Sequence, residues 1–278
     1  MLTVLLVLAC IAGVIWYAIF TQSKGVLTVS FLDVGQGDAI FIETPSGAQV
    51  LIDGGKGAAV IRTLSDVLPW YDRSIDLVMA THPDQDHIGG LVEVLARYSV
   101  PLILKSSVRD EKGTDYIAFE KALTKEGSRV IEVERGQIVD LGDSARLEIL
   151  FPDRSVPAIE TNTGSIVARL VYGETSFMLT GDAPDEVEIY LVGLGTTTLR
   201  SNVLKAGHHG SKTSSAPVFI GYVDPEYAVY SRGCGNSYGH PSAETIETFA
   251  KFQIPTLDTC EEGTVTFVSD GRKVTLKK

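Results

Sequence analysis

The chain has 278 residues, of which 44% are hydrophobic and 21% are charged. This mixture is typical of a folded protein and excludes a disordered chain. The 24 basic and 35 acidic residues give a formal net charge of −11, which argues against a broad basic groove that binds nucleic acid by counterion release. A local cationic site formed by bound metal is compatible with this charge.

An uncharged apolar segment opens the chain at residues 2–20. As a helix it would be about 28 Å long at ~1.5 Å per residue, close to the ~30 Å hydrocarbon core of a bilayer. A cleaved signal peptide is the alternative, but it would have a basic n-region and a shorter apolar stretch. We therefore expect a single-pass membrane anchor at residues 1–23, followed by a second domain at residues 24–278.

The three cysteines, Cys10, Cys234 and Cys260, form neither a disulfide framework nor a CxxC zinc ribbon. Cys234 and Cys260 would be able to pair if the domain lies outside the cytoplasm, and two unpaired thiols is the interpretation that we favour. The sequence leaves the side of the membrane open, because long domains are translocated with little regard to neighbouring charges. Our working expectation is an extracytoplasmic domain.

Strands and helices alternate after the apolar segment. The predicted strands are residues 26–34, 38–44, 49–53, 75–81, 101–105, 129–133, 145–151, 165–173, 175–181, 202–207, 226–231, 264–269 and 273–277. The predicted helices are residues 58–68, 91–98, 115–127, 184–194, 216–222 and 242–252. This order predicts a layered α/β fold in one domain, with two similar halves that meet near residues 152–165.

Histidines follow predicted strands throughout this domain, in short segments that contain Gly, Ser or Pro: His82, His87, His208, His209 and His240. The strongest segment is THPDQDHIGG, at residues 81–90, where Asp84 and Asp86 lie between two histidines. Two imidazoles and two carboxylates suit one or two divalent cations, and carboxylate favours harder ions such as manganese. A polar turn that caps a helix would explain the aspartates but not both histidines.

Three further segments carry candidate ligands at the ends of predicted strands. FMLTGD ends at Asp182, whose carboxylate would either bridge two metal ions or cap the next helix. LKAGHHGSK places His208 and His209 between glycines, which allow backbone shapes that other residues resist, so we favour a ligand or catalyst over a surface loop. His240, in SYGHP, remains open between the two interpretations.

Two other aspartates have competing interpretations. Asp53 ends a predicted strand before two glycines, where it would serve either a hairpin turn or a hydrogen bond that holds a ligand histidine. Asp38 follows VGQG, and we favour a structural role in which it holds its own loop through backbone hydrogen bonds.

Five motifs occur in one order along the chain: FLDVGQGDAIFIETPSG, LIDGG, THPDQDHIGGL, SIVARLVYG with FMLTGD, and LKAGHHGSKTSS. Taken together, they resemble the metallo-β-lactamase fold superfamily, and within it the C-terminal nuclease-like domain of the competence DNA-uptake channel family (ComEC). The resemblance covers about residues 26–270. Most of that superfamily has histidine where this chain has Asp84, and bacterial phosphorylcholine esterases of the same fold are similar to the chain at this motif.

The resemblance implies a four-layer αββα sandwich with a binuclear metal site at one edge, between two mixed sheets. The implied cofactors are two divalent metal ions, manganese or zinc. The implied metal ligands are His82 and Asp84 for the first ion, Asp86, His87 and His208 for the second, and Asp182 between them. Asn162 falls where many members have a further ligand histidine. Which of His208 and His209 is the ligand is open, and we favour His208, with His209 facing the substrate.

The predicted function is metal-dependent hydrolysis of a phosphodiester by a nuclease that acts on DNA in competence-type uptake, with a metal-bound hydroxide as the nucleophile. Asp84, His209 and His240 are the expected catalytic residues, the histidines because they would neutralise developing negative charge. The channel proteins of that family are much longer, so this chain would be a stand-alone relative anchored in a membrane through residues 2–20, or a partner of a separate channel protein.

Three alternatives remain from the sequence. One is an esterase for a small phosphodiester of the phosphorylcholine type, which the acidic charge favours slightly. The second is a lactonase or thioester hydrolase, against which the resemblance to the uptake family argues. The third is a catalytically silent, membrane-tethered DNA-binding module, against which the complete set of candidate ligands argues. The native metal, the strand preference and the oligomeric state are left open by the sequence.

Overall fold

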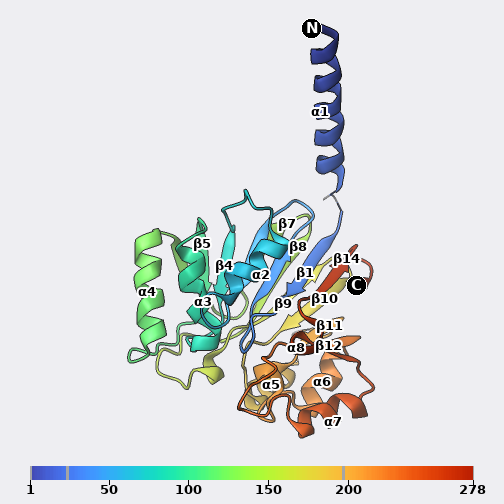
Figure 1. The fold of residues 1–278 in the computed structure, drawn as a ribbon. Coiled ribbons are helices and arrows are strands. Elements are labelled where there is room, and N and C mark those ends of the chain that lie inside the picture. The colour runs from blue at the N-terminus through green and yellow to red at the C-terminus, as the bar shows by residue number, and fades with distance from the viewer. Residues whose placement is uncertain (1, 23–24, 196–197, 278) are drawn as a thin grey trace.

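Two β-sheets lie face to face in the computed structural model, which describes residues 2–22, 25–195 and 198–277 (Figure 1). The first sheet has the strand order β15–β14–β1–β2–β3–β4–β5–β6. Its strands are β1 (Leu27–Phe31), β2 (Ile40–Glu43), β3 (Gln49–Ile52), β4 (Leu77–Ala80), β5 (Leu102–Lys105), β6 (Arg129–Glu132), β14 (Val265–Ser269) and β15 (Val274–Lys277). The chain therefore returns to the first sheet at its C-terminal end, as the red strands show.

The second sheet has the strand order β13–β12–β11–β10–β9–β8–β7. Its strands are β7 (Ile138–Gly142), β8 (Ala145–Phe151), β9 (Val167–Tyr172), β10 (Thr175–Leu179), β11 (Val203–Lys205), β12 (Tyr227–Tyr230) and β13 (Thr256–Asp258). The chain passes into this sheet between β6 and β7, so the predicted seam at residues 152–165 is wrong. The predicted seam lies too far toward the C-terminus, because β7 is not among the predicted strands and β8 is therefore counted with the first half.

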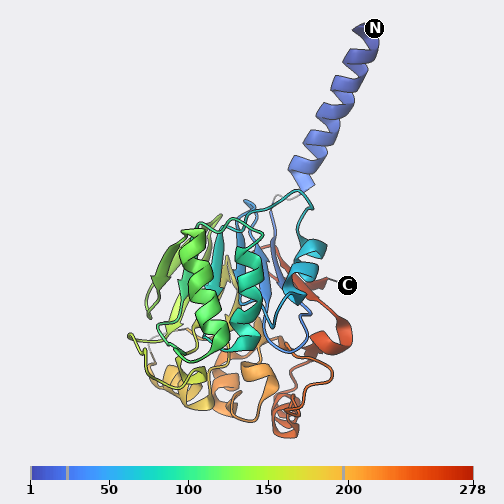
Figure 2. The ribbon, with the colours of Figure 1, turned by 60° about the vertical axis from the view of Figure 1, so that its left-hand side comes forward.

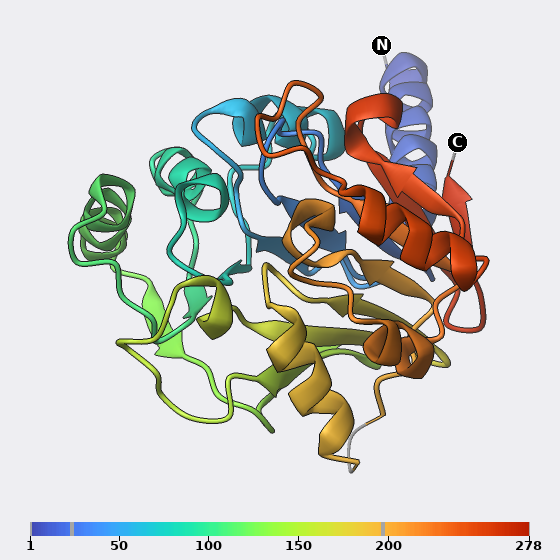
Figure 3. The same cartoon turned by 90° about the horizontal axis from the view of Figure 1, so that it is seen from below.

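Helices cover the outer face of each sheet, as Figures 2 and 3 show. The first sheet packs against α2 (Ala59–Val67), α3 (Gln85–Leu95) and α4 (Thr114–Glu126) through one buried apolar cluster. The second sheet packs against α5 (Asp185–Gly193), α6 (Pro217–Val223) and α7 (Ala243–Lys251) through another. A short helix α8 (Thr259–Glu262) follows β13. The mixed α/β sandwich of two sheets predicted from the sequence is confirmed.

A separate helix, α1 (Leu2–Gln22), extends from the two-sheet body. Across the described part of the chain, no helix combines the length and the apolar character needed to cross a membrane. The membrane anchor expected at residues 2–20 is therefore not confirmed. The expected boundary between anchor and second domain, at residues 23 and 24, lies outside the described residues.

Both sheets contain parallel pairs, and this arrangement positions the site. In the first sheet β3, β4, β5 and β6 are parallel neighbours, and in the second β10, β11, β12 and β13 are. Parallel neighbours end at the same edge of a sheet. The segments that follow β3, β4, β10 and β11 are those that carry the candidate ligands, so the topology gathers them at one edge of the sandwich.

The core between the sheets is apolar and contains a cluster of aromatic rings. Phe267 in the first sheet lies with its ring centroid 6.1 Å from that of Phe31, 6.2 Å from Phe177 and 5.6 Å from Tyr227. Phe177 and Tyr227 belong to the second sheet, and Phe267 is fully buried. The contact with Phe177 is edge-to-face and that with Tyr227 is tilted, and these two contacts join the two sheets directly.

Replacing Phe267 by alanine is expected to lower the free energy of unfolding by about 3–5 kcal/mol, because it removes a buried ring and leaves a cavity between the sheets. Phe252→Ala is the matched control, because Phe252 is 43% exposed and its loss should cost roughly 1 kcal/mol. Urea unfolding followed by circular dichroism measures both. Equal losses in the two variants would contradict the assignment of Phe267 to the inter-sheet core.

Candidate metal centre

Asp53 organises the first two histidines from the end of β3. Its Oδ1 accepts the Thr81 backbone N–H at 2.8 Å, and its Oδ2 lies 2.7 Å from His87 Nδ1. Thr81 Oγ1 donates to Asp53 Oδ2 at 2.6 Å and lies 3.1 Å from His82 Nδ1. A histidine whose Nδ1 is held by a carboxylate turns Nε2 toward a ligand, which is the arrangement found behind metal-binding imidazoles. Asp53 was expected either to serve a hairpin turn or to hold a histidine, and the structure shows the contact with His87.

Helix α3 begins inside the HxDxDH segment, at Gln85, and not at residue 91 as predicted. A close backbone contact explains this early start. The Gly54 backbone N–H donates to the carbonyl of His87 at 2.7 Å, and a side chain at Gly90 would collide with the Gly54 carbonyl. The glycines therefore let the first turn of α3 lie directly against the end of β3, with His87 fully buried beside Asp53.

The GHHG segment forms a tight turn in which both histidines have left-handed backbone angles. The φ angles are 47° at His208 and 57° at His209, a conformation that costs free energy in residues other than glycine. His209 is buried, and its Nδ1 donates to the carbonyl of Ser231 at 2.8 Å. Its Nε2 is thereby directed into the same space as the imidazoles of the first sheet.

One carboxylate oxygen lies at the centre of this space. Oδ2 of Asp182 is 3.2 Å from His87 Nε2, 3.3 Å from His209 Nε2 and 4.0 Å from His82 Nε2. His208 Nε2 lies 3.7 Å from the same oxygen, but this side chain is 27% exposed. The structure therefore places His209, and not the favoured His208, among the buried imidazoles, with His208 at the rim.

The two aspartates of the motif also face this centre. Asp86 Oδ2 lies 3.3 Å from His209 Nε2, and Asp84 Oδ2 lies 3.8 Å from His82 Nε2. Asp84 is the more exposed, at 37% of its side chain. Segments from both sheets thus converge on one point and bring together His82, Asp84, Asp86, His87 and Asp182. Their role as metal ligands stays a prediction.

Lys205 was not predicted as a site residue, and Asp38 was expected to have a structural role outside the site. Lys205, at the end of β11, is fully buried, and its Nζ lies 2.6 Å from Asp38 Oδ2 and 3.4 Å from Asp182 Oδ1. Asp38 Oδ1 lies 3.3 Å from His209 Nδ1, so Asp38 stands behind the imidazoles instead of merely holding its own loop. The available signal was a lysine that interrupts an apolar strand just before two histidines, since lysine is seldom buried without a partner.

The electrostatics of the cluster follow from burial and from these contacts. Burial alone would raise the pKa of Asp182, but His209, His87 and Lys205 together lower it well below its usual range. Burial alone would lower the pKa values of His87 and His209, but the neighbouring carboxylates raise both well above the usual range. Burial and the charge of His87 lower the pKa of His82. The carboxylates therefore stabilise positive charge at the centre of the site.

The donor atoms fit divalent metal ions. Candidate ligand atoms of Asp38, His87, Asp182 and His209 lie within 4.8 Å of one another. The Nε2 atoms of His82, His87 and His209 are buried without a hydrogen-bond partner among the described residues, and such atoms are costly unless something binds them. Asp38 is part of this geometric group, but it faces Nδ1 atoms and pairs with Lys205, so we regard it as a supporting residue and not as a ligand.

The two remaining predicted residues are Asn162 and His240. Asn162 begins a short 3-10 turn, and its Oδ1 is buried without a hydrogen-bond partner among the described residues. The ring centroid of His240 lies 5.5 Å from that of His208 and 6.4 Å from that of His209. Burial and both neighbouring imidazoles lower the pKa of His240 to about 4, so this imidazole is neutral near pH 7.

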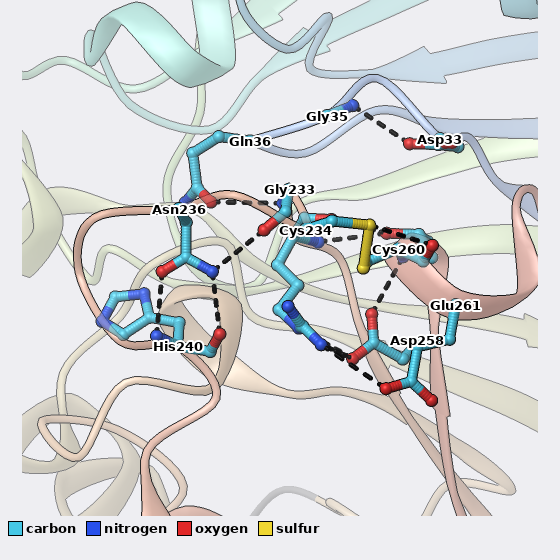
Figure 4. The surroundings of a disulfide bond; sticks show 12 residues. Asp33, Gly35, Gln36, Gly233, Cys234, Asn236, His240, Asp258, Cys260 and Glu261 are labelled. Atoms are coloured by element: carbon cyan, nitrogen blue, oxygen red, sulfur yellow. Dashed lines mark hydrogen bonds and ion pairs between the residues drawn. A yellow bond between two sulfur atoms is a disulfide. The ribbon is translucent and has the colours of Figure 1, made fainter.

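A disulfide holds the segment that carries His240 (Figure 4). Cys234 and Cys260 are bonded, so the favoured interpretation of two unpaired thiols is wrong. The two cysteines are 26 residues apart, so their proximity is not evident from the sequence. They meet because β12 and β13 are parallel neighbours. Within the segment, the Asn236 side chain donates to the carbonyl of His240 at 2.8 Å and accepts from its N–H at 2.9 Å.

A cavity of about 490 Å³ opens beside the cluster. Its lining includes Asp84 and Asp86, together with Tyr116 and with Tyr238 of the disulfide-bonded segment. Tyr238 is stacked on His240, with a centroid distance of 5.7 Å and an interplanar angle of 25°. A ligand in this cavity would therefore meet the aspartates of the HxDxDH segment and two aromatic side chains.

The sequence matches one protein family and several curated relatives. The family profile described as the metallo-beta-lactamase superfamily matches residues 32–233. ComE operon protein 3 of Bacillus subtilis is 31% identical over 86% of this chain and 32% of its own length. Competence protein ComA of Neisseria gonorrhoeae is 32% identical over 84% of the chain and 31% of its own length. The chain thus spans about a third of the length of these relatives.

Solved structures share the fold at lower identity. Igni18, a metallo hydrolase from Ignicoccus hospitalis, superposes with a TM-score of 0.57 at 20% identity, covering 86% of this chain and 98% of its own. CmlA, a diiron beta-hydroxylase from Streptomyces venezuelae, gives a TM-score of 0.58 at 15% identity over 86% of this chain and 53% of its own. At these identities the similarity supports the fold alone.

Glu188 should make stability depend on pH. Its side chain is buried and accepts hydrogen bonds from the backbone N–H groups of Ser215 and Ala216. Burial is the main reason that the pKa of this carboxyl is raised to about 7. Between pH 4.5 and 7 the folded chain keeps a proton that the unfolded chain releases, so stability falls as pH rises, by on the order of 3 kcal/mol. In the Glu188→Gln variant this part of the decrease in unfolding free energy should be absent. Urea unfolding at several pH values measures it.

The matched control for this prediction is Glu186→Gln, because Glu186 is exposed on the same helix. Its stability should decline between pH 4.5 and 7 as that of the wild type does. A wild type and a Glu188→Gln variant with parallel pH profiles would contradict the assignment.

Removal of the disulfide should destabilise the domain. The double variant Cys234→Ser/Cys260→Ser is expected to lose about 3 kcal/mol of unfolding free energy, because the unfolded chain regains the freedom that the cross-link removes. Guanidinium unfolding without reductant provides the measurement, and Cys10→Ser, which changes an exposed free thiol, is the control. The bond would be ruled out if the double variant unfolded at the same denaturant concentration as Cys10→Ser.

Proposed function

The chain belongs to the metallo-beta-lactamase superfamily, and from this membership and the geometry of the site we propose that it is a metal-dependent phosphodiesterase that cleaves DNA. The observation that carries the proposal is a set of three buried Nε2 atoms around one oxygen of Asp182, none of which has a hydrogen-bond partner among the described residues. Imidazole and carboxylate donors at such a point are suited to binding divalent metal ions.

The residues around Asp182 divide into two groups. We assign His82 and Asp84 to a first metal ion. We add Asn162 as a weak donor, because its buried amide oxygen has no hydrogen-bond partner in the part of the chain that the structure describes. We assign Asp86, His87 and His209 to a second ion, which changes the earlier expectation for His208. Asp182 lies between the groups, and its Oδ2 is within 4.0 Å of His82 as well as of His87 and His209.

When bound, two divalent cations would activate water and neutralise negative charge on a phosphoryl group. The surrounding residues support this chemistry in separate ways. Asp53 and Ser231 hold the Nδ1 atoms of His87 and His209, which keeps their Nε2 atoms available to metal. His208 and His240 lie at the rim, where each has a ring that a bound substrate would contact.

His240 orients substrate as a neutral group in this proposal. Its pKa of about 4 makes it a poor proton donor near neutral pH, because a general acid works best with a pKa close to the operating pH. A neutral imidazole still donates or accepts one hydrogen bond. This assigns His240 a part in binding, and we assign contact with the leaving group to His208, whose side chain is 27% exposed.

DNA is the substrate that we favour, because one relative is named a competence protein and another, from Haemophilus influenzae, is named recombination protein 2. The acidic net charge of −11 argues against a broad basic surface, so in this proposal the metal centre contributes most of the attraction for phosphate. A small phosphodiester is the second candidate, and the aspartates at the cavity support it: Asp110 and Asp115 line the same cavity as Asp84 and would repel a second phosphate.

The disulfide supports a location outside the cytoplasm, as proposed for the domain. Disulfides persist in oxidising compartments, whereas thiols of most cytosolic proteins are kept reduced. The bond joins Cys234, in the segment that carries His240, to Cys260, so oxidation contributes to the order of the rim of the site.

Asp182→Ala is expected to reduce DNA hydrolysis by at least about 1,000-fold, because the carboxylate lies at the centre of both ligand groups. Hydrolysis is measured with purified protein on labelled DNA and on a chromogenic phosphodiester, with manganese, zinc or a chelator. Asp270→Ala, at an exposed turn, is the matched control and should retain full activity.

The outcomes separate the candidate functions. Cleavage of DNA by the wild type with manganese, and not with chelator, supports a nuclease. Cleavage of only the small substrate would replace it with the esterase. Metal-free wild-type protein that binds DNA without cleaving it would favour a silent binding module, and full DNA cleavage by Asp182→Ala would overturn the assigned centre.

A further inference from the structure

Lys205 is a cation built into the interior of the site. Its side chain has no exposed surface, and its ammonium has an acceptor for each of its three N–H groups. These are Asp38 Oδ2 at 2.6 Å, the Gly181 carbonyl at 2.8 Å and Asp182 Oδ1 at 3.4 Å. Complete pairing of this kind is the condition under which a lysine is tolerated in a protein interior.

These contacts separate the two oxygens of Asp182. Oδ1 lies toward Lys205, whereas Oδ2 lies toward the imidazoles of His87 and His209 at 3.2 and 3.3 Å. The Gly181 carbonyl, one residue before Asp182, binds the same ammonium. Lys205 is therefore attached to both the backbone and the side chain of the segment that presents the central carboxylate.

We propose that Lys205 is a positioning residue for the metal centre, which holds Asp182 so that only Oδ2 faces the ligand histidines. Asp38 has the complementary part, because it fixes the ammonium from the opposite side. Free rotation of the Asp182 carboxylate would let both oxygens turn toward one metal ion and weaken its contact with the other. This inference rests on the proposed metal-dependent function.

A simpler role for Lys205 is neutralisation of buried negative charge. Removing Lys205 alone does not distinguish the two roles, because the more negative site would attract cations more strongly while Asp182 became less ordered. The double variant Asp38→Asn/Lys205→Met removes one positive and one negative charge, so the net charge of the site stays constant. The double variant removes the contact between the Lys205 ammonium and Asp182. It also avoids leaving Asp38 buried without its counterion.

The experiment measures manganese binding by isothermal titration calorimetry, with the melting temperature of the metal-free protein recorded for every variant. Asp38→Asn/Lys205→Met is expected to bind manganese about 10–100-fold more weakly than the wild type, the usual effect of removing a residue that orients a ligand. The matched control is Glu148→Gln/Arg169→Met, which removes an ion pair with a 3.1 Å contact from strands β8 and β9. It should lower the melting temperature without changing manganese affinity.

Each outcome bears on the inference separately from the proposed function. A folded double variant with wild-type manganese affinity would overturn the positioning role, while leaving the metal centre in place. A wild type that binds neither manganese nor zinc would overturn the proposed function itself. If the double variant does not fold, Lys205→Arg replaces it: a guanidinium preserves the charge but not the shape of the ammonium, so weakened manganese binding supports positioning, and unchanged binding contradicts it.

Discussion

The position of Asp182 between a buried ammonium and a group of buried imidazoles is the interaction on which the rest of the site depends. An isolated carboxylate in this interior would be costly, because burial removes its hydration. Lys205 on one side and His87 with His209 on the other offset that cost and hold the pKa of Asp182 low. These groups come from different sheets, so the charged cluster forms only when the sandwich is assembled.

The fold explains why such distant residues meet. Strands β3 and β4 of the first sheet and β10 and β11 of the second end at one edge of the sandwich, and each is followed by a segment with a polar residue that points into the site. The close approach of Gly54 and Gly90 lets α3 begin within the ligand motif, and the left-handed turn at His208 and His209 reverses the chain after β11. Backbone packing thus sets the directions of the imidazoles.

Most of the strands and helices, and one segment of the candidate metal site, were predictable because they depend on local sequence patterns. Alternating apolar runs gave most strands and helices, and the spacing of His82, Asp84, Asp86 and His87 indicated a metal site from one segment alone. The strands β7 and β13 were missed, since the first is largely exposed and the second has three residues. Short or exposed strands carry little hydrophobic signal and depend on their neighbours in the sheet.

Contacts between distant segments could not be predicted. The sequence motif contains both His208 and His209, but which one is buried depends on backbone angles that non-glycine residues rarely adopt. The role of Lys205 depends on its contacts with Asp38 and Asp182, which are distant from it in sequence and adjacent in space. The pairing of Cys234 with Cys260 likewise depends on the parallel alignment of β12 with β13.

Anomalous diffraction from crystals of the protein grown with manganese tests the proposed metal centre most directly. We predict anomalous density for manganese among the Nε2 atoms of His82, His87 and His209, in contact with Asp182, while the Lys205 ammonium stays between Asp38 and Asp182. Manganese bound elsewhere on the molecule, or density showing that these imidazoles point away from one another, would contradict it.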